Sequence, residues 1–374
     1  MSGFVIVVAV VLAALTGALF RGLAAAPRWP SGVRWLVGGV LGLGWVGLLA
    51  GFAVQGGELD PRRFRWLAWL GMTWLAVWWY LLLGACVLGL VSLALRWKRR
   101  YLRPVLRVGS VVVAVVALGA SAYGLGEAAM PAVSRVTVAS ADLPVGMEGT
   151  KVALVTDLHV GPIRDAGFTR RVVQAINAAE PDLVVLGGDL ADGRVDQVGG
   201  ALAPLAELRA PLGVVAVSGN HEYLSGQPEQ WLSLWERLGI TVLRNSSVVV
   251  GRGGAAFTVA GLTDPQGGRF GAAPDPGTAL AGTDPAGFTL LVAHQPRQAL
   301  DVQGRGVDLQ LSGHTHGGQL WPFTYLVRLQ QAMTAGRATI GDVPVLTSRG
   351  AGAWGPPVRV LAPPEIPLVT LTRR

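Results

Sequence analysis

Hydrophobic residues follow two different patterns along the chain. In the first third they form four long, nearly unbroken runs, which cover Phe4 to Phe20, Trp35 to Val54, Trp66 to Leu95 and Val105 to Leu125. Each run is near or above the roughly 20 residues that an α-helix needs to cross a bilayer. A buried soluble core also contains apolar helices, but four such runs in succession, with arginine-containing loops between them, favour membrane helices. Residues 1–125 are therefore predicted to form a membrane domain.

Beyond residue 130 the apolar runs become short and alternate with helical patterns. Residues 126–150 are predicted to contain a linker and a first, half-exposed strand, because "SRVTVAS" alternates apolar and polar positions. Short aliphatic runs follow at 152–155, 183–186, 214–217 and 289–293, as in strands buried on both faces. Residues 151–374 are therefore predicted to form one α/β domain.

Three segments of this domain have a more specific pattern. The helix predicted over 169–179 has Val172, Val173, Ile176 and Ala179 on one face and Pro181 as its stop, and the helix over 227–238 has Trp231, Leu234, Trp235 and Leu238 on one face. The stretch 251–287 is rich in Gly, Pro and Asp and is predicted to be mostly turns and loops.

The net charge of +8 is unevenly distributed. Residues 1–125 contain 12 Lys+Arg and 2 Asp+Glu, whereas the remainder contains 19 and 21. The basic residues therefore belong to loops that flank the predicted membrane helices. The α/β domain has no basic stripe, which argues against a nucleic-acid partner and against a secreted nuclease.

The loop charges also predict an orientation. The first and third loops hold nine Lys+Arg, whereas the second loop and the region after the fourth run hold four, so the first and third loops are predicted to be cytoplasmic and the α/β domain to lie outside the cytoplasmic membrane. Nine of the thirteen tryptophans lie in this part of the chain, and Trp66, Trp69 and Trp97 fit an interfacial belt or packing between helices. A cleaved signal peptide ending near Ala26 is the weaker alternative, because Pro27 would follow the cut. The single cysteine, Cys86, lies in the third run and excludes an intramolecular disulfide.

All five histidines lie where a predicted strand ends. The side chains in these positions are Asp157, His159, Asp189, Asn220, His221, His294, His314 and His316. The carboxyl ends of buried parallel strands are the usual place for a ligand site. Carboxylates, imidazoles and one amide oxygen, without sulfur, suit a pair of divalent metal ions such as Mn²⁺, Fe²⁺ or Zn²⁺. The spacings D-x-H and H-x-H are attributed to extended backbone, in which residues two apart point the same way.

The ordered series D-x-H, G-G-D, G-N-H-E, H and G-H-T-H resembles the calcineurin-like metallophosphoesterase superfamily. The stretches "GHTHGGQLWPF" and "TSRGAGAWGPPVRVLAPPEIPLVTL" resemble its membrane-anchored bacterial branch, and the resemblance covers Ser134 to Leu371. It implies a four-layer α/β/β/α sandwich with a binuclear metal centre at one edge. The predicted architecture is therefore this sandwich, preceded by four transmembrane helices.

The resemblance also implies roles for single residues. Asp157, His159 and His316 would bind the first metal; Asn220, His294 and His314 would bind the second; Asp189 would bridge both. His221 would lie beside the substrate phosphate without binding metal and is a candidate general acid. Glu222 is expected to orient a neighbour, and Arg349 and Arg359 would either meet phosphate or form structural pairs.

The predicted function is hydrolysis of phosphomonoesters or phosphodiesters, lipid-linked ones among them, at the membrane. Two cations would clamp the phosphate oxygens and lower the pKa of a water between them, and the hydroxide would attack phosphorus. A scaffold or receptor with a ligand-binding but non-catalytic phosphoesterase fold is the alternative, against which the intact ligand set argues. The segment "WPFTYLVRLQQAM", residues 321–333, is either an apolar wall that admits acyl chains or, as apolar stripes usually are, a helix that packs on the sandwich.

Overall fold

The computed structural model describes residues 3–374, which form two compact units. The helical unit contains the described residues up to Gly126 together with Gly355–Val358. The α/β unit contains Glu127–Trp354 and Arg359–Arg374. The two units are described separately below.

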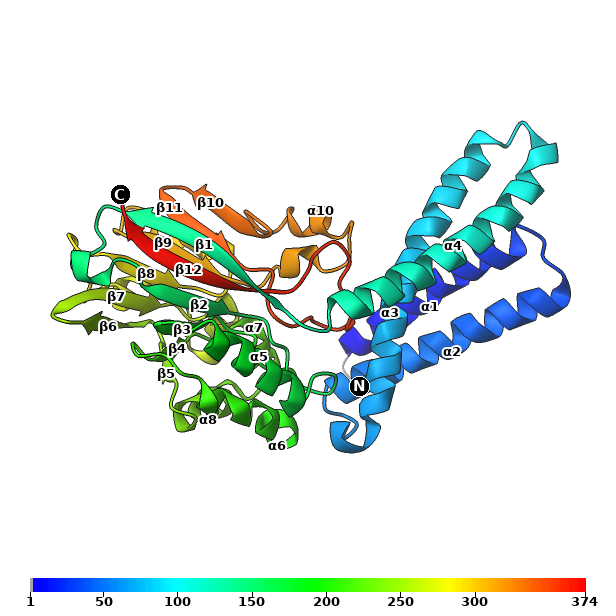
Figure 1. The fold of residues 1–374 in the computed structure, drawn as a ribbon. Helices are drawn as coiled ribbons and strands as arrows, with labels where there is room; N and C mark the ends of the chain where they lie inside the picture. Colours follow the sequence, from blue (N-terminus) through cyan, green and yellow to red (C-terminus); the bar gives the residue numbers. More distant parts are fainter. Residues whose placement is uncertain (1–2) are drawn as a thin grey trace. The chain divides into compact units, whose positions relative to one another are not determined.

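The helical unit consists of four long apolar helices (Figure 1). They are α1 (Gly3–Phe20), which continues as a short π-helix over Arg21–Ala25, α2 (Ser31–Gln55), α3 (Pro61–Ala94) and α4 (Arg99–Glu127). All four are long and apolar enough to cross a membrane. The four predicted membrane helices are therefore confirmed as helices, with bounds close to those of the apolar runs that predicted them.

Small residues and a few polar contacts hold these helices together. A Cβ atom added to Gly71 of α3 would collide with the carbonyl oxygen of Gly47 in α2, so these two backbones touch directly. The indole nitrogen of Trp78 donates to the hydroxyl of Thr16 over 3.1 Å. Close backbone approach at glycine and side-chain hydrogen bonds between helices are the usual means by which membrane helices associate.

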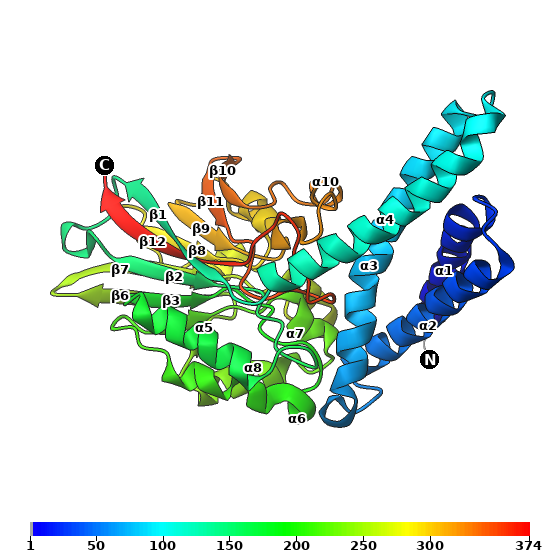
Figure 2. The same cartoon turned by 45° about the vertical axis from the view of Figure 1, so that its right-hand side comes forward.

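The α/β unit contains two six-stranded mixed sheets (Figure 2). The first sheet has the order β1-β12-β2-β3-β4-β5, with β1 (Ala132–Ser140), β12 (Glu365–Arg373), β2 (Lys151–Val155), β3 (Leu183–Leu186), β4 (Val214–Ala216) and β5 (Thr241–Val242). The second has the order β10-β11-β9-β8-β7-β6, with β10 (Gly336–Ile340), β11 (Val343–Thr347), β9 (Leu309–Ser312), β8 (Thr289–Val292), β7 (Ala255–Gly261) and β6 (Ser246–Arg252). Strands β2, β3, β4 and β5 run parallel, as do β7, β8, β9 and β11.

Alternation along the buried strands assigns their side chains to different layers. Val152 and Leu154 of β2 face the second sheet and pack with Leu290 and Leu311, whereas Ala153 and Val155 face the outer helices. Successive side chains of a strand point to opposite faces, so a strand covered on both sides must be apolar throughout. The predicted four-layer α/β/β/α sandwich is confirmed.

Helices of unequal length form the two outer layers. The first sheet is covered by α5 (Ala166–Ala178) and α8 (Pro228–Arg237), with the short α6 (Val195–Val198) and α7 (Asn220–Leu224) nearby (Figure 1). The second sheet is covered mainly by the short α9 (Pro276–Ala279) and a 3₁₀-helix over Pro296–Val302. Trp231 and Trp235 of α8 are completely buried, and Leu232 is the third residue of this helix in the core, while the predicted Leu234 and Leu238 are only partly buried.

Two features differ from the sequence-based prediction. Strand β7 lies inside the stretch 251–287, which was predicted to be mostly turns; its small residues fit between β6 and β8, and pairing on both edges stabilises a segment with weak strand propensity. Over 321–333 the structure has only α10 (Thr324–Val327), and none of its residues is buried. The interpretation of this segment as a helix packed on the sandwich is therefore wrong, because the apolar side chains of residues 321–329 are exposed or only partly buried, and only Met333 at its end packs in the core beside the second sheet.

Candidate metal centre

The carboxyl ends of five strands bring the predicted side chains to one place. Asp157 and His159 follow β2, Asp189 follows β3, Asn220 and His221 follow β4, His294 follows β8, and His314 and His316 follow β9. The first three strands belong to one sheet and the last two to the other. Both sheets therefore contribute to a single cluster, as the sequence predicts.

Three of these side chains form a first group. Asp157, His159 and His316 are buried, and one ligand atom from each lies within 4.8 Å of the others. The Nε2 atoms of His159 and His316 are 3.0 Å apart, and His316 Nε2 lies 3.5 Å from Asp157 Oδ1. These atoms face a common point.

A second group forms around Asn220. Its Oδ1 atom lies 2.9 Å from His314 Nδ1 and 3.2 Å from His294 Nε2, and these two ring nitrogens are 3.2 Å apart. His294 is fully buried, whereas Asn220 and His314 are partly exposed. The second group is thus open to solvent on the side of Asn220 and His314.

Asp189 lies between the two groups. Its Oδ2 atom is 3.2 Å from His294 Nε2 of the second group and 3.8 Å from His159 Nε2 of the first. Its Oδ1 atom accepts a hydrogen bond from the backbone N–H of His221 over 2.8 Å. One carboxylate is therefore within reach of both groups.

The donor set fits bound cations. The carbonyl oxygen of Gly187 lies 2.8 Å from Nδ1 of His294, so that nitrogen carries a hydrogen and Nε2 faces the Asn220 oxygen. Burial opposes a charged imidazole, but Asp189 raises the pKa of His294 well above its ordinary value, so this position attracts positive charge, either a proton or a cation. Several lone pairs then converge in a buried space, which is favourable only with positive charge between them. Although burial opposes a charged carboxyl, the neighbouring histidines His294 and His221 hold the pKa of Asp189 well below its ordinary value. Nitrogen and oxygen donors of this kind suit divalent transition metals.

The backbone around these residues is strained rather than extended. Asp157, His159, Asp189, His314 and His316 all have positive φ angles, of 56°, 46°, 53°, 71° and 52°. Residues other than glycine seldom adopt this region, and such conformations concentrate at functional sites. The prediction that extended backbone aligns the D-x-H and H-x-H pairs is therefore wrong: tight turns directly after the strands aim these side chains.

Hydrogen bonds between the loops hold the turns in place. The N–H of Asp157 donates to Gly188 and that of His159 donates to Asp189, over 3.0 and 3.1 Å. The N–H of His314 donates to both carboxylate oxygens of Asp157, each over 3.1 Å. The strained conformations are thus stabilised by the neighbouring loops.

Glu222 has the orienting role that was expected of it. Its buried carboxylate accepts hydrogen bonds from the backbone N–H groups of Gly219, Asp189 and Leu190 over 2.7, 3.0 and 2.9 Å. Burial raises the pKa of Glu222 to about 7, and the charge of Asp189 adds to this effect. Both oxygens of this carboxylate accept backbone hydrogen bonds, so Glu222 fixes the turn that carries Asp189.

Asp192 was missed by sequence reasoning. Its Oδ1 atom lies 2.7 Å from Nδ1 of His221 and 2.9 Å from Nδ1 of His159, so it accepts from both rings. A shared carboxylate fixes the tautomer of each ring and leaves both Nε2 atoms directed away from it. Its position three residues after Asp189, in "GGDLAD", was the only signal in the sequence.

The neighbouring carboxylates also set the charge of His221. Burial by itself lowers the pKa of this imidazole, but the charges of Asp189 and Asp192, with the hydrogen bond to Asp192, raise it to about 9. The pKa of Asp192 lies well below its ordinary value because His159 and His221 outweigh its burial. The His221 ring is therefore held by Asp192 and is partly exposed to solvent.

The two candidate phosphate-binding arginines have structural partners. The guanidinium group of Arg349 pairs with Glu365 at 2.8 Å. Arg359 is fully buried and donates to the carbonyl oxygens of His316 and Ala362 over 3.0 and 3.1 Å, and it also donates to Gly352. Burial lowers the pKa of Arg359 to about 9. Of the two roles that the sequence left open, the contacts favour the structural one.

The contacts of Arg359 explain the stretch 347–365, which metal chemistry alone leaves unaccounted for. The N–H groups of Ala351 and Gly352 donate to the carbonyl oxygens of Thr156 and Asp157 over 2.9 and 2.8 Å. Gly350 has a φ of 79°, and a Cβ atom there would lie 2.6 Å from the Cβ of Asp157. This stretch therefore supports the turn that carries Asp157. It also places the ring of Trp354 5.8 Å from that of His221.

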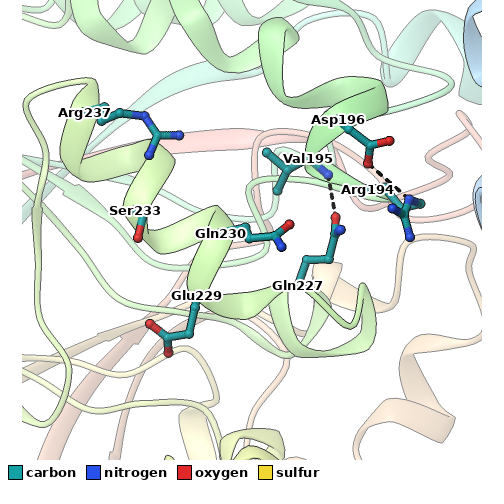
Figure 3. A pocket seen from close by; sticks show the side chains of 8 residues that line it. All are labelled: Arg194, Val195, Asp196, Gln227, Glu229, Gln230, Ser233 and Arg237. Atoms are coloured by element: carbon teal, nitrogen blue, oxygen red, sulfur yellow. Dashed lines mark hydrogen bonds and ion pairs between the residues drawn. The ribbon is translucent and has the colours of Figure 1, made fainter.

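A separate open cavity of about 660 Å³ lies between α6 and α8 (Figure 3). It is lined by Arg194, Val195, Asp196, Gln227, Glu229, Gln230, Ser233 and Arg237. Arg194 pairs with Asp196, and the side chain of Gln227 accepts from the N–H of Val195 (Figure 3). None of the side chains of the candidate metal centre lines this cavity, so the cavity is separate from that centre.

Comparison with known proteins agrees with the geometry. Residues 150–318 match the family described as calcineurin-like phosphoesterase. An uncharacterized metallophosphoesterase of Helicobacter pylori (strain J99) is 39% identical over 224 residues, which are 59% of this chain and 59% of the relative. A transmembrane protein with metallophosphoesterase domain from Danio rerio is 34% identical over 272 residues, 70% of this chain and 61% of the relative.

These two matches span less than two thirds of each relative. A third relative, an uncharacterized metallophosphoesterase of Aquifex aeolicus (strain VF5), is 33% identical over 261 residues, which are 68% of this chain and 97% of the relative. Nearly the whole length of that protein is thus matched, and the chain belongs to the calcineurin-like metallophosphoesterase family.

Proposed function

We propose that the chain is a membrane-anchored, metal-dependent hydrolase of phosphomonoesters or phosphodiesters. The observation that carries this proposal is Asp189, whose Oδ2 atom lies 3.2 Å from His294 and 3.8 Å from His159, between two groups of ligand atoms. In this reading Asp157, His159 and His316 would hold one cation, Asn220, His294 and His314 would hold a second, and Asp189 would be within reach of both. Mn²⁺, Fe²⁺ and Zn²⁺ are the ions that the donor set favours.

The chain's own groups prepare the reaction. When bound, two divalent cations would neutralise the phosphate oxygens and activate a water molecule for attack on phosphorus. His221, held through Nδ1 by Asp192, would donate a proton to a phosphoryl oxygen or to the leaving oxygen. Asp192 fixes the ring through Nδ1, and Glu222 holds the turn before Asp189. The reaction then needs little movement of the protein.

The intact ligand set favours an enzyme over a scaffold with a non-catalytic fold. A protein that only binds a ligand does not need a proton donor held by a buried carboxylate beside the ligand cluster. The pair of His221 and Asp192, 2.7 Å apart, supplies such a donor.

Asp189→Asn is expected to lower hydrolysis of bis-p-nitrophenyl phosphate by more than about 100-fold with Mn²⁺ present. Loss of a shared ligand should exceed the 10–100-fold that outer partners of metal ligands usually contribute. The bound metal is measured by mass spectrometry alongside the rate. Asp196→Asn, which removes only an exposed ion pair with Arg194, is the control and should retain activity. Near-normal turnover of Asp189→Asn would refute the shared-ligand role.

His221→Ala is expected to keep both metals but to lower turnover about 10²- to 10⁴-fold for alkyl phosphates, as general acids usually do. The loss should be smaller for p-nitrophenyl esters, whose leaving oxygen needs no proton. The slope of rate against leaving-group pKa measures this difference. An equal loss for all esters would indicate that His221 only positions phosphate, and loss of metal would contradict its assignment as a non-ligand.

Asp192→Asn is expected to affect two properties, because its carboxylate holds both His221 and His159. Turnover should fall about 10–100-fold, and metal affinity should fall through His159. In a His221→Ala background the same substitution should cost less turnover but the same metal affinity. Additive losses of turnover in the double variant would show that Asp192 does not act through His221.

We further propose that residues 1–125 form the membrane anchor, 126–150 the linker and first strand, and 151–374 the catalytic domain. The catalytic domain is placed outside the cytoplasmic membrane, because nine Lys+Arg in the first and third loops outnumber four elsewhere. Arg62, Arg63 and Arg65 in the second loop oppose this orientation but are fewer.

Fusions after Arg374 test the orientation directly. Alkaline phosphatase fused there is expected to be active. A fluorescent protein that becomes fluorescent only in the cytoplasm is expected to remain dark at the same position. The same two reporters after Arg100, in the predicted cytoplasmic third loop, should give the reverse result. A bright fluorescent fusion and an inactive phosphatase at Arg374 would place the domain in the cytoplasm.

A further inference from the structure

Exposed apolar side chains gather on two segments next to the metal centre. We name this set the apolar rim; it consists of Trp321, Phe323, Tyr325, Leu326, Leu329, Trp354 and Leu361. Leu329 is 81% exposed, Leu361 66% and Trp354 53%. Soluble surfaces seldom expose so many large apolar residues together, and such patches usually mark binding sites.

Hydrogen bonds join the two segments into one surface. The side chain of Gln319 donates to the carbonyl of Trp354 over 2.8 Å and accepts from its N–H over 3.0 Å. The backbone of Gln319 accepts from Val360, and the N–H of Trp321 donates to the carbonyl of Val360, over 2.8 and 3.1 Å. Trp354 itself and Val360, the residue before Leu361, are therefore tied to Gln319 and Trp321 at the start of the 321–333 segment.

The same surface is tied to the ligand residues. The hydroxyl of Thr324 in α10 donates to the carbonyl of Gly317 over 2.9 Å, one residue beyond His316. The ring of Trp354 lies 5.8 Å from that of His221, the proposed proton donor. A substrate whose phosphate reaches the ligand cluster would thus have the apolar rim beside it.

The rim has features that folding alone does not favour. None of the residues of α10 is buried, so its apolar side chains contribute nothing to the core. Leu361 has a φ of 55°, a backbone conformation that is unfavourable for leucine. Its apolar side chain is also 66% exposed to solvent. Costs of this kind are usually offset by a function of the site.

We propose that the apolar rim faces the lipid bilayer and receives the apolar part of an amphiphilic phosphoester from it. This inference rests on the proposed function and narrows its substrate class. The chain carries four helices able to cross a membrane, so its catalytic part would always be close to lipid. The guanidinium of Arg328 lies 5.7 Å from the ring of Tyr325, and such a pair of cation and aromatic ring suits the headgroup region of an anionic membrane.

Two esters with the same reacting group test the substrate class. Ethyl p-nitrophenyl phosphate and hexadecyl p-nitrophenyl phosphate both release p-nitrophenol, but only the second has a long chain. The full chain, reconstituted in nanodiscs with Mn²⁺, is expected to show kcat/KM at least 10-fold higher for the hexadecyl ester. A double substitution, Leu326→Ser with Leu329→Ser, should reduce this ratio by about 10-fold and change the rate with the ethyl ester less than twofold.

Matched controls identify the surface responsible. Leu300→Ser and Val249→Ser change residues that are 52% and 65% exposed on other elements of the α/β unit, and the ratio should stay unchanged. A ratio that survives the rim substitutions, or falls equally in the controls, would overturn the proposal. If the wild-type chain with Mn²⁺ hydrolyses neither ester, the proposed phosphoesterase activity itself fails.

A contact measurement tests the bilayer as the source without relying on activity. In a Cys86→Ser background, bimane attached to Leu329→Cys is expected to be quenched by brominated lipid chains in nanodiscs. Bimane attached to Leu300→Cys should not be quenched. Absence of quenching at position 329 would refute bilayer contact even if the hexadecyl preference is found, because that preference would then come from free amphiphile.

Discussion

Lone pairs on buried and partly buried imidazole, amide and carboxylate groups converge at one edge of the sandwich, and they can remain together only if positive charge lies between them. Asp189 is the centre of this constraint, since its two oxygens face His294 and His159 on one side and the N–H of His221 on the other. In the proposed enzyme, bound cations would satisfy this constraint. The arrangement of the nearby loops follows from the need to hold these groups at fixed distances.

Buried charged side chains around the cluster hold its residues in place through hydrogen bonds. Glu222 uses its whole carboxylate to fix the N–H groups around Asp189, and Asp192 fixes two imidazole rings at once. Arg359, fully buried, binds the carbonyl of His316 and those of its own segment. Positive φ angles at five ligand residues cost free energy, and these hydrogen bonds offset the cost. Rigid ligands are what a reaction that depends on preorganised charge requires.

The segment that braces the turn at Asp157 also contains the exposed Trp354, beside His221. One stretch of chain therefore has a buried side that supports the ligands and an exposed apolar side next to them. The same stretch therefore stabilises the ligand residues and supplies exposed apolar side chains beside them. It explains why a long C-terminal stretch without metal ligands can still matter to the site.

The sequence alone determined much of this protein. Four apolar runs predicted the four long helices, and the short buried runs predicted β2, β3, β4 and β8, because hydrophobic period and length are local properties. The position of histidines after strands predicted the ligand cluster, since parallel strands end at a common edge.

The tertiary structure decided the rest. Strand β7 depends on neighbours on both edges, the turns at Asp157 and His314 depend on hydrogen bonds from other loops, and the contacts of Asp192 with two rings join residues that local sequence does not relate. Exposure of residues 321–329 was likewise beyond the sequence, because an apolar stripe has the same pattern whether it is covered or faces outward.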